Sequence, residues 1–265
     1  MRNINILNNS SINKDIYGYF PLNETGGKII TDRIGGHHAT TTSDIIQKGS
    51  QWGGAMNFNN NTITCSTINI PNFPMTVSYW VQWDDILAAA GNNSEHELFT
   101  ISNATTSRRI RLFIKKITST VWLLNMHIAD QIGSAGTFFN QNTFNFGTDN
   151  GLYSGGGPYW GSRYRQWVHF AITAISTSST VFYLNGRYVT SIGRGTPNNY
   201  TSFTLGTGSQ AAFKAIDLKI WKRVLNQNEI FQLAQRPYYG TEVGITRYQE
   251  IISTSNGNGS WFFFN

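Results

Sequence analysis

The chain has 265 residues, of which 40% are hydrophobic, 14% aromatic and only 13% charged, and it carries a formal net charge of +6. This length suits one large β domain or two small ones with a sizeable core, and the mild basic charge permits acidic partners without requiring them. A single cysteine excludes an intramolecular disulfide, no apolar run is long enough to insert in a membrane, and no secretory signal is visible at Met1.

The first 16 residues are polar and rich in asparagine, and they predict an N-terminal arm. From Tyr17 onward the chain has the period of β-strands, most clearly in residues 75–81, where β-branched and aromatic side chains alternate with Thr and Ser. Asn185-Gly186 between two apolar runs predicts a β-hairpin. Because no break in composition interrupts this pattern, we expect one domain over residues 17–236.

A predicted strand over residues 110–115 has apolar residues on one side and basic residues on the other, namely Arg109, Arg111 and Lys115. The simpler interpretation is a solvated outer face of a sheet. The alternative is a phosphate-binding patch, but the Gly-rich or aromatic context of nucleic-acid readers is missing. We therefore do not expect nucleic acid as a partner.

From Gly133 to Arg165 the strand period disappears, and we interpret this stretch as one long loop, which is usually functional in a compact domain. Its aromatic rings and amides match the apolar faces and hydroxyls of sugars, and the candidate ligand-binding residues are Asn150, Tyr153, Tyr159, Trp160 and Tyr164. Tyr and Trp also dominate contacts between proteins. Glycan contact, contact with other protein subunits and local packing over a sheet edge all stay open.

The most specific local pattern runs from a strand into a helix. Apolar residues alternate with polar ones and Trp in the strand, which predicts one buried face formed by Ile216, Leu218 and Ile220. Asn226 and Glu229 have the spacing of a capping box, and Leu225 and Ile230 that of a hydrophobic staple. The sequence therefore predicts a short helix here.

After Pro237 a tail of residues 237–265 ends in the apolar run Trp261-Phe262-Phe263-Phe264. Such a run is too apolar to remain in water and too short to fold alone. We expect it to dock on the domain or on a partner subunit.

The order of segments over roughly residues 17–235 resembles the laminin G-like jelly-roll domains of the concanavalin A-like lectin and glucanase superfamily. The motifs that carry this resemblance are Tyr19-Phe20-Pro21-Leu22, Asp32-Arg33-Ile34-Gly35-Gly36, residues 54–58, residues 77–81, Gln166-Trp167-Val168-His169, residues 182–186, Leu205-Gly206 and residues 216–230. Ala215 departs from the glycine that the family usually has before its Ile-Asp pair. The resemblance implies an all-β fold, a two-sheet antiparallel jelly-roll sandwich with one short C-terminal helix.

The resemblance also implies a structural Ca²⁺, with Asp32 and Asp217 at the matching positions. Calcium needs six to eight oxygen ligands, many of them carbonyls, so two carboxylates are a plausible minimum. In the alternative, Asp32 caps a turn and Asp217 is an outward strand residue paired with Arg33 or Lys219. His169 stands where the family commonly has histidine, and we expect a structural role for it.

No enzyme activity and no catalytic residue are expected. Glu95 and Glu97 are the place where two carboxylates share one face of a possible strand, but the longer acidic motif of the glucanases is missing. Glycoside hydrolysis needs two carboxyl groups held at a set separation. His37 and His38 are adjacent on an extended segment and point apart, which disfavours a transition-metal site.

Two functions stay open. The first is a non-enzymatic structural or interaction protein with a lectin-like fold, most simply a virion component (capsid, fibre or tail) that contacts glycans, because a charge-poor surface and apolar termini suit packing between subunits. The alternative is a carbohydrate-binding module, a lectin that attaches to cell-surface or matrix polysaccharide. In either case we expect the protein on a virion or an extracellular surface.

Overall fold

The computed structural model describes residues 11–50, 53–58, 61–70, 74–83, 95–103, 109–116, 122–129, 139–145, 167–176, 179–192, 200–206 and 213–237. Its elements are η1 (Ser11–Asn13), β1 (Ile16–Phe20), β2 (Ile29–Ile30), β3 (Ala39–Thr41), β4 (Ile46–Ser50), β5 (Gly53–Asn57), β6 (Ile63–Cys65), β7 (Met75–Trp83), β8 (Glu95–Ser102), β9 (Arg109–Lys116), β10 (Trp122–Ala129), β11 (Phe139–Asn145), β12 (Val168–Ser176), β13 (Ser179–Leu184), β14 (Arg187–Ile192), β15 (Ser202–Leu205), β16 (Phe213–Trp221) and α1 (Gln227–Leu233). The regular elements of the described part are therefore almost all strands.

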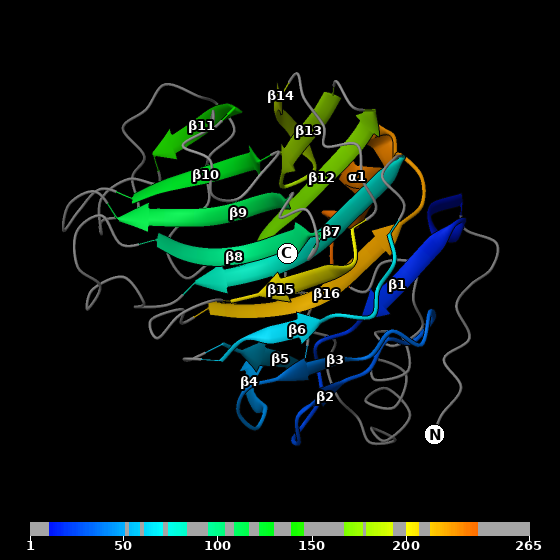
Figure 1. Ribbon diagram of the computed structural model, residues 1–265, viewed down its shortest axis with the longest axis vertical. Coiled ribbons are helices and arrows are strands. Elements are labelled where there is room, and N and C mark those ends of the chain that lie inside the picture. Colours follow the sequence, from blue (N-terminus) through cyan, green and yellow to red (C-terminus); the bar gives the residue numbers. More distant parts are fainter. Residues whose placement is uncertain are drawn as a thin grey trace, which may run out of the picture.

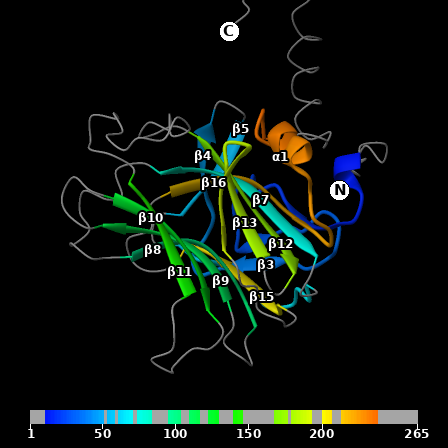
Figure 2. The same cartoon turned by 90° about the horizontal axis from the view of Figure 1, so that it is seen from above.

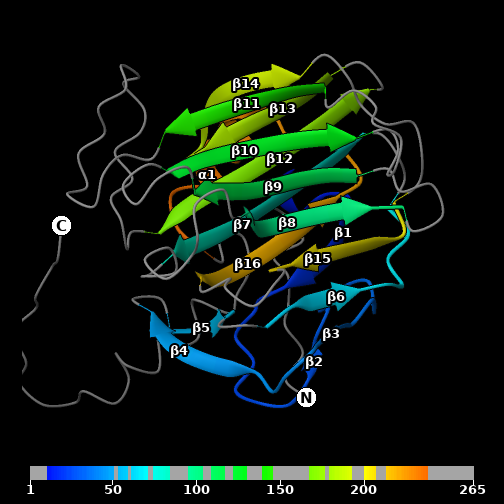
Figure 3. The same ribbon diagram turned by 60° about the vertical axis from the view of Figure 1, so that its left-hand side comes forward.

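The described strands form two antiparallel sheets of eight strands each (Figure 1). The first sheet has the order β14-β13-β12-β7-β16-β5-β4, with β1 paired to β16, and the second has the order β11-β10-β9-β8-β15-β6-β3-β2. Figure 3 shows the strands of the two sheets stacked over one another. The predicted all-β sandwich with a short helix is confirmed.

Aromatic side chains from both sheets hold the sandwich together. The ring of Phe20 on β1 lies 5.1 Å from that of Phe203 on β15. Tyr79 on β7 lies 5.8 Å from Phe99 on β8 and 5.7 Å from Phe170 on β12. All five side chains are buried, and burying each one stabilises the fold by about 1.5–3 kcal/mol. This aromatic layer is the centre of the core.

A β-bulge in β16 changes which side chains face the core. The register with β7 shifts between Ile216 and Lys219, and Asp217 has a positive φ of 61°. Leu218 and Ile220 lie in the core between the sheets, whereas Ile216 packs in a separate cluster on the outer face. The prediction that these three residues share one face was wrong, because the extra residue of a bulge reverses the alternation of side chains.

The long loop predicted between Gly133 and Arg165 also needs correction. Strand β11 falls inside this stretch and pairs with β10, for example at Phe144 and Leu124. Its segment mixes asparagine and phenylalanine without clear alternation, so its sequence does not show the period of a strand. The connection between the sheets is therefore shorter than expected and spans residues 146–167.

Helix α1 covers the outer face of the first sheet (Figure 2). Its predicted capping box is confirmed: the Asn226 side chain accepts from Glu229 N at 3.0 Å, and the Glu229 carboxylate accepts from Asn226 N at 2.9 Å. Leu225 and Ile230 are buried in one cluster with Trp221. No helix among the described residues is long and apolar enough to cross a membrane.

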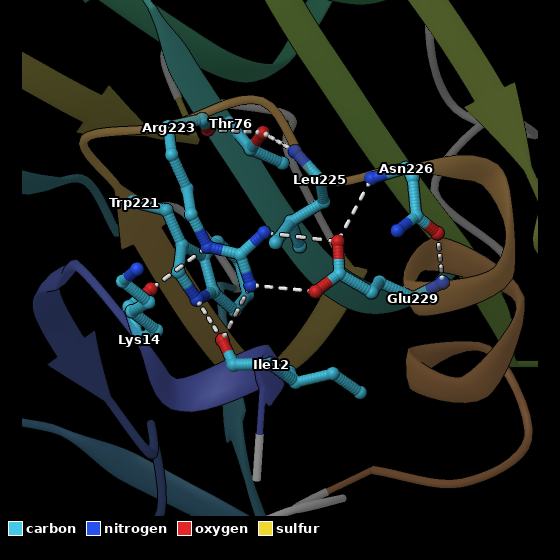
Figure 4. A network of polar contacts seen from close by, with 8 residues as sticks. All are labelled: Ile12, Lys14, Thr76, Trp221, Arg223, Leu225, Asn226 and Glu229. Carbon is cyan, nitrogen blue, oxygen red and sulfur yellow. Dashed lines mark hydrogen bonds and ion pairs between the residues drawn. The ribbon is translucent and has the colours of Figure 1, made fainter.

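An arginine after β16 joins the distant N-terminal segment to helix α1 (Figure 4). The Arg223 guanidinium donates to both carboxylate oxygens of Glu229 at 2.7 and 2.9 Å, and its Nε donates to the Lys14 carbonyl at 2.9 Å. Trp221 Nε1 donates to the Ile12 carbonyl at 2.6 Å. The end of the predicted N-terminal arm is thereby fixed to β16 and α1.

The predicted hairpin is formed by β13 and β14. Asn185 and Gly186 have φ values of +48° and +76°, as the two central residues of a type I′ turn require. A Cβ on Gly186 would lie 2.9 Å from both Phe231 Cα and Ala234 Cβ. Glycine is therefore needed here both for its backbone conformation and for the close approach of α1.

We predict that Glu229→Gln lowers the free energy of unfolding at pH 7 by about 1–3 kcal/mol, because it weakens the bonds to Arg223 and Asn226. Burial raises the pKa of Glu229, but hydrogen bonds from these two residues outweigh it and leave the pKa below its ordinary value of 4.5. The stabilisation is therefore present above that value and is lost as the pH falls through the lower folded-state pKa.

Urea unfolding of both proteins from pH 7 into the acid range measures this difference. The two stabilities should converge at low pH. Asp44→Asn, which neutralises an exposed carboxylate, is the matched control and should leave the midpoint unchanged. Equal midpoints for wild type and Glu229→Gln at pH 7 would contradict the prediction.

Candidate functional site

Several strands of both sheets begin or end at one end of the sandwich, which we call the loop end. Strand β7 finishes at Trp83 opposite Phe213, where β16 begins, and Val168 starts β12 opposite Val81. The rings of Phe58 and Phe213 stack at 4.4 Å, which brings the end of β5 against the start of β16. The connections that leave or enter strands here are residues 58–62, 84–94, 117–121, 146–167 and 206–212.

The predicted ligand-binding residues all belong to the connection of residues 146–167. Asn150, Tyr153, Tyr159, Trp160 and Tyr164 lie outside the described residues, so their role stays a prediction. The described strands do fix the connection's two ends. It leaves β11, the edge strand of the second sheet, after Asn145 and enters the first sheet at Val168 of β12.

An ion-pair cluster occupies the outer face of the second sheet. Arg111 on β9 donates through Nη1 to Glu95 and through Nε to Glu97, each at 2.7 Å, and its guanidinium lies 4.2 Å from the centre of the Phe113 ring. Thr204 on β15 donates to the second oxygen of Glu97 at 3.2 Å. One guanidinium therefore binds both carboxylates.

This ion-pair cluster fits neither glycoside hydrolysis by Glu95 and Glu97 nor phosphate binding by Arg111. In glycoside hydrolysis the two carboxyl groups face each other across a substrate, whereas Glu95 and Glu97 share one cation. A phosphate patch needs an arginine with free donors, whereas Arg111 is engaged by two acids. Arg111 and Glu97 have only 14% and 9% of their side chains exposed, so this part of the face is not fully solvated, and the side chains of Arg109 and Lys115 lie outside the described residues.

A row of threonines crosses the same face, and the sequence analysis missed it. Thr40, Thr64, Thr204 and Thr100 lie directly opposite one another across β3, β6, β15 and β8, and Arg111 continues the row on β9. Each threonine stands between apolar or buried residues of its own strand. That alternation is the available signal, but in strands as short as β6 and β15 it is hard to recognise.

Asp32, the first predicted calcium ligand, is saturated by backbone hydrogen bonds. Its Oδ1 accepts from Tyr19 N at 2.9 Å and from Ile34 N at 3.0 Å. Its Oδ2 accepts from Gly35 N and His37 N, both at 3.1 Å. A carboxylate offers about four lone-pair positions, so these N–H groups fill them all. The geometry matches the turn-capping alternative.

Asp217, the second predicted ligand, is paired with a buried lysine. Lys219 Nζ lies 2.9 Å from Asp217 Oδ1 and 3.0 Å from Oδ2, and neither side chain is more than 3% exposed. The ammonium also lies 5.4 Å from the ring centre of Tyr19. A cation of the protein itself already neutralises Asp217, so these donors do not fit Ca²⁺. The described residues contain no group of three or more His, Cys, Asp or Glu that could hold a metal.

His169 is buried on the outer face of the first sheet, and its Nε2 lies 2.7 Å from Ser78 Oγ. Burial, together with the charge of Lys219, lowers the pKa of His169 to about 3. The imidazole is therefore neutral at physiological pH. The backbone N–H of His169 also donates to Asn185 Oδ1 at 3.0 Å and so holds the hairpin turn. The geometry of His169 fits the structural role expected for it.

Comparisons with known proteins point to one class of fold. No protein-family model and no curated protein matches the chain. Among solved structures, the binding domain of Paraclostridial Mosquitocidal Protein 1 aligns with a TM-score of 0.61 and 16% identity, over 84% of this chain and 52% of that one. The binding domain of botulinum neurotoxin serotype D aligns with a TM-score of 0.57 and 12% identity, over 85% and 53%.

A third neighbour is the binding domain of botulinum neurotoxin DC in complex with SialylT, with a TM-score of 0.56 and 14% identity, over 85% of this chain and 52% of that one. The chain thus spans about half the length of the solved structures it matches. At such low identity the likeness shows the fold alone: a β-sandwich shared with toxin binding domains. The narrower laminin G-like assignment stays a prediction.

We predict that calcium does not stabilise this protein, because Asp32 and Asp217 are satisfied by protein groups. Thermal unfolding of the full chain in EDTA and in CaCl₂ should give the same midpoint. Asp32→Asn should lower the free energy of unfolding by about 1–3 kcal/mol, because an amide nitrogen cannot accept the N–H bonds that a carboxylate oxygen accepts. The exposed Asp44→Asn serves as control. A lower midpoint in EDTA alone would reinstate the calcium hypothesis.

Proposed function

We propose that this β-sandwich is a non-enzymatic carbohydrate-binding module that recognises glycans at its loop end. The observation that carries the proposal is the position of the two strands that flank residues 146–167, β11 at the edge of the second sheet and β12 in the first. This connection holds aromatic rings and an amide, and described strands of both sheets anchor its two ends. Binding residues on loops positioned by a rigid scaffold are a recurrent arrangement in proteins.

The chemistry of these residue types supports the proposal. The flat rings of Tyr153, Tyr159, Trp160 and Tyr164 offer apolar faces to the C–H groups of a sugar ring. Their hydroxyl and indole N–H groups, with the amide of Asn150, offer hydrogen bonds to its hydroxyls. The pairing of Glu95 and Glu97 with Arg111 supports a binding role over hydrolysis.

The structural neighbours add support by analogy of fold. They are binding domains, and one of them is described in complex with SialylT. Since one fold carries many functions, this analogy is consistent with the proposal but is not sufficient evidence for it. A glycan-binding role places the protein at an extracellular surface.

We predict that Trp160→Ala weakens glycan binding at least about tenfold while leaving the fold intact, because an aromatic contact centre contributes most of the binding energy. A glycan array identifies the ligand, calorimetry measures its affinity, and circular dichroism checks the fold. Tyr188→Ala, which removes an aromatic ring that is 52% exposed on β14, is the matched control. Equal affinities in wild type and Trp160→Ala would refute this placement of the site.

A second candidate function is that of a virion subunit whose contacts with other subunits involve the aromatic connection and the C-terminal tail. The apolar run Trp261–Phe264 in a chain with only 13% charged residues supports it. Contacts between subunits favour such aromatic residues and disfavour charged ones.

If this candidate is right, the double substitution Trp261→Ser and Phe263→Ser should reduce a large particle or fixed oligomer to monomers. Light scattering on the full chain measures the size of both proteins. Glycan binding at the loop end should be unaffected, which separates the two proposals. A wild-type protein that is monomeric at all concentrations would contradict the virion-subunit function and leave only the carbohydrate-binding module as a candidate.

A further inference from the structure

Three side chains with available polar atoms meet at the end of the first sheet opposite to the loop end. They are Tyr17 of β1, His37 of the loop before β3, and Lys222 directly after β16. Lys222 Nζ lies 3.7 Å from the centre of the Tyr17 ring, and the centre of the His37 ring lies 5.1 Å from it. Ile16 pairs with Trp221 here, so β1 and β16 bring Tyr17 beside Lys222, and the loop before β3 brings His37 to the Tyr17 ring. We call this cluster the Tyr17 corner.

Among the described residues, no acidic side chain neutralises the charge of Lys222. No carboxylate forms an ion pair with its ammonium group anywhere in the described ranges. Asp15 is an exposed neighbour, and the interaction recorded between the two is the hydrogen bond from Lys222 N to the Asp15 carbonyl, at 2.9 Å. A cation–π contact with Tyr17 holds the ammonium in position but satisfies none of its three N–H donors. Lys222 is therefore pre-positioned with its donors available to an anion.

The neighbouring acid, Asp32, forms no ion pair with Lys222. Asp32 is buried, and its carboxylate is taken up by four backbone N–H groups, including that of His37 at 3.1 Å. These bonds fix the loop, and a Cβ on Gly35 would lie 2.5 Å from the Tyr17 carbonyl, so loop and strand are in close contact. Besides Asp15, the exposed charged or titratable residues next to the Tyr17 corner in the chain are Lys14, Arg33 and His38.

The polar atoms of the two rings are also available. Within the described part of the chain, neither the Tyr17 hydroxyl nor the ring nitrogens of His37 make a hydrogen bond, and both side chains are half-buried. An ammonium, a phenol and an imidazole on rigid supports are suited to an oxyanion, which accepts hydrogen bonds from all three.

We propose that the Tyr17 corner is a second ligand site, which binds the carboxylate or sulfate group of an acidic glycan. Lys222 forms the ion pair, and Tyr17 and His37 donate hydrogen bonds to the remaining oxygens of the anion. The net charge of +6 draws acidic ligands toward the protein. The sugar part of the inference rests on the proposed function, whereas the anion part rests on the corner alone.

Calorimetry on the full chain at low salt, with four probes, tests this site. Lactose is the neutral sugar, 3′-sialyllactose and 3′-sulfolactose carry the acidic group, and sodium sulfate supplies the free anion. Wild type should bind both acidic sugars at least about tenfold more tightly than lactose, and more tightly than sulfate. Lys222→Met should remove the preference for acidic sugars, and Tyr17→Phe and His37→Phe, which each remove a hydrogen-bond donor, should each reduce it severalfold.

The control is Lys28→Met, which removes the same charge from an exposed position at the start of β2 and should keep the preference. An undiminished preference in Lys222→Met, or equal loss in Lys28→Met, would overturn the inference. Sulfate binding as tight as that of 3′-sulfolactose would overturn its sugar part. Sulfate binding that Lys222→Met abolishes, without binding of any sugar, would refute the glycan function but support the anion site. Loss of lactose binding in Trp160→Ala would support the glycan site at the loop end, and the preference for acidic sugars at the Tyr17 corner is judged from the Lys222→Met result.

Discussion

Strand β16 is buried on both faces, and the packing of both the core and the outer layer follows from this. Leu218 and Ile220 enter the core between the sheets, while Lys219 and Trp221 are covered on the outer face. A buried ammonium group is costly unless an acid compensates it. The bulge at Asp217 supplies that acid two residues away, at 2.9 Å, and at the same time reverses the facing of Ile216. The bulge thus provides the carboxylate that compensates the buried ammonium group and also decides which side chains of β16 face the core.

The same strand links the two proposed ligand sites. It begins at Phe213 beside the loop end and finishes at Trp221, next to Lys222 of the Tyr17 corner. Beyond it, Arg223 fastens both the N-terminal segment and α1 to the outer face. A scaffold held this firmly suits binding, because little conformational entropy is lost when a ligand meets pre-positioned groups.

The likeness to toxin binding domains concerns the sandwich, which covers most of this chain but only about half of those structures. With identities of 12–16%, what is shared is the arrangement of strands and not the chemistry of a site. The residues that can carry a function are those of this chain: the aromatic residues between β11 and β12, the Arg111 cluster with its threonine row, and Lys222, which forms no ion pair with any described carboxylate. Function must therefore be argued from these residues.

The features that depend on neighbours along the chain could be predicted from the sequence: the alternation in β7, the Asn185-Gly186 turn and the capping box of Asn226 and Glu229. Each depends on residues at most a few positions apart, and their preferences can be recognised in the sequence. Only the tertiary structure decided the bulge at Asp217, the hydrogen bonds of Asp32 and the meeting of Tyr17 with Lys222. These depend on which distant strands pair and in which register, and local preferences do not specify that register.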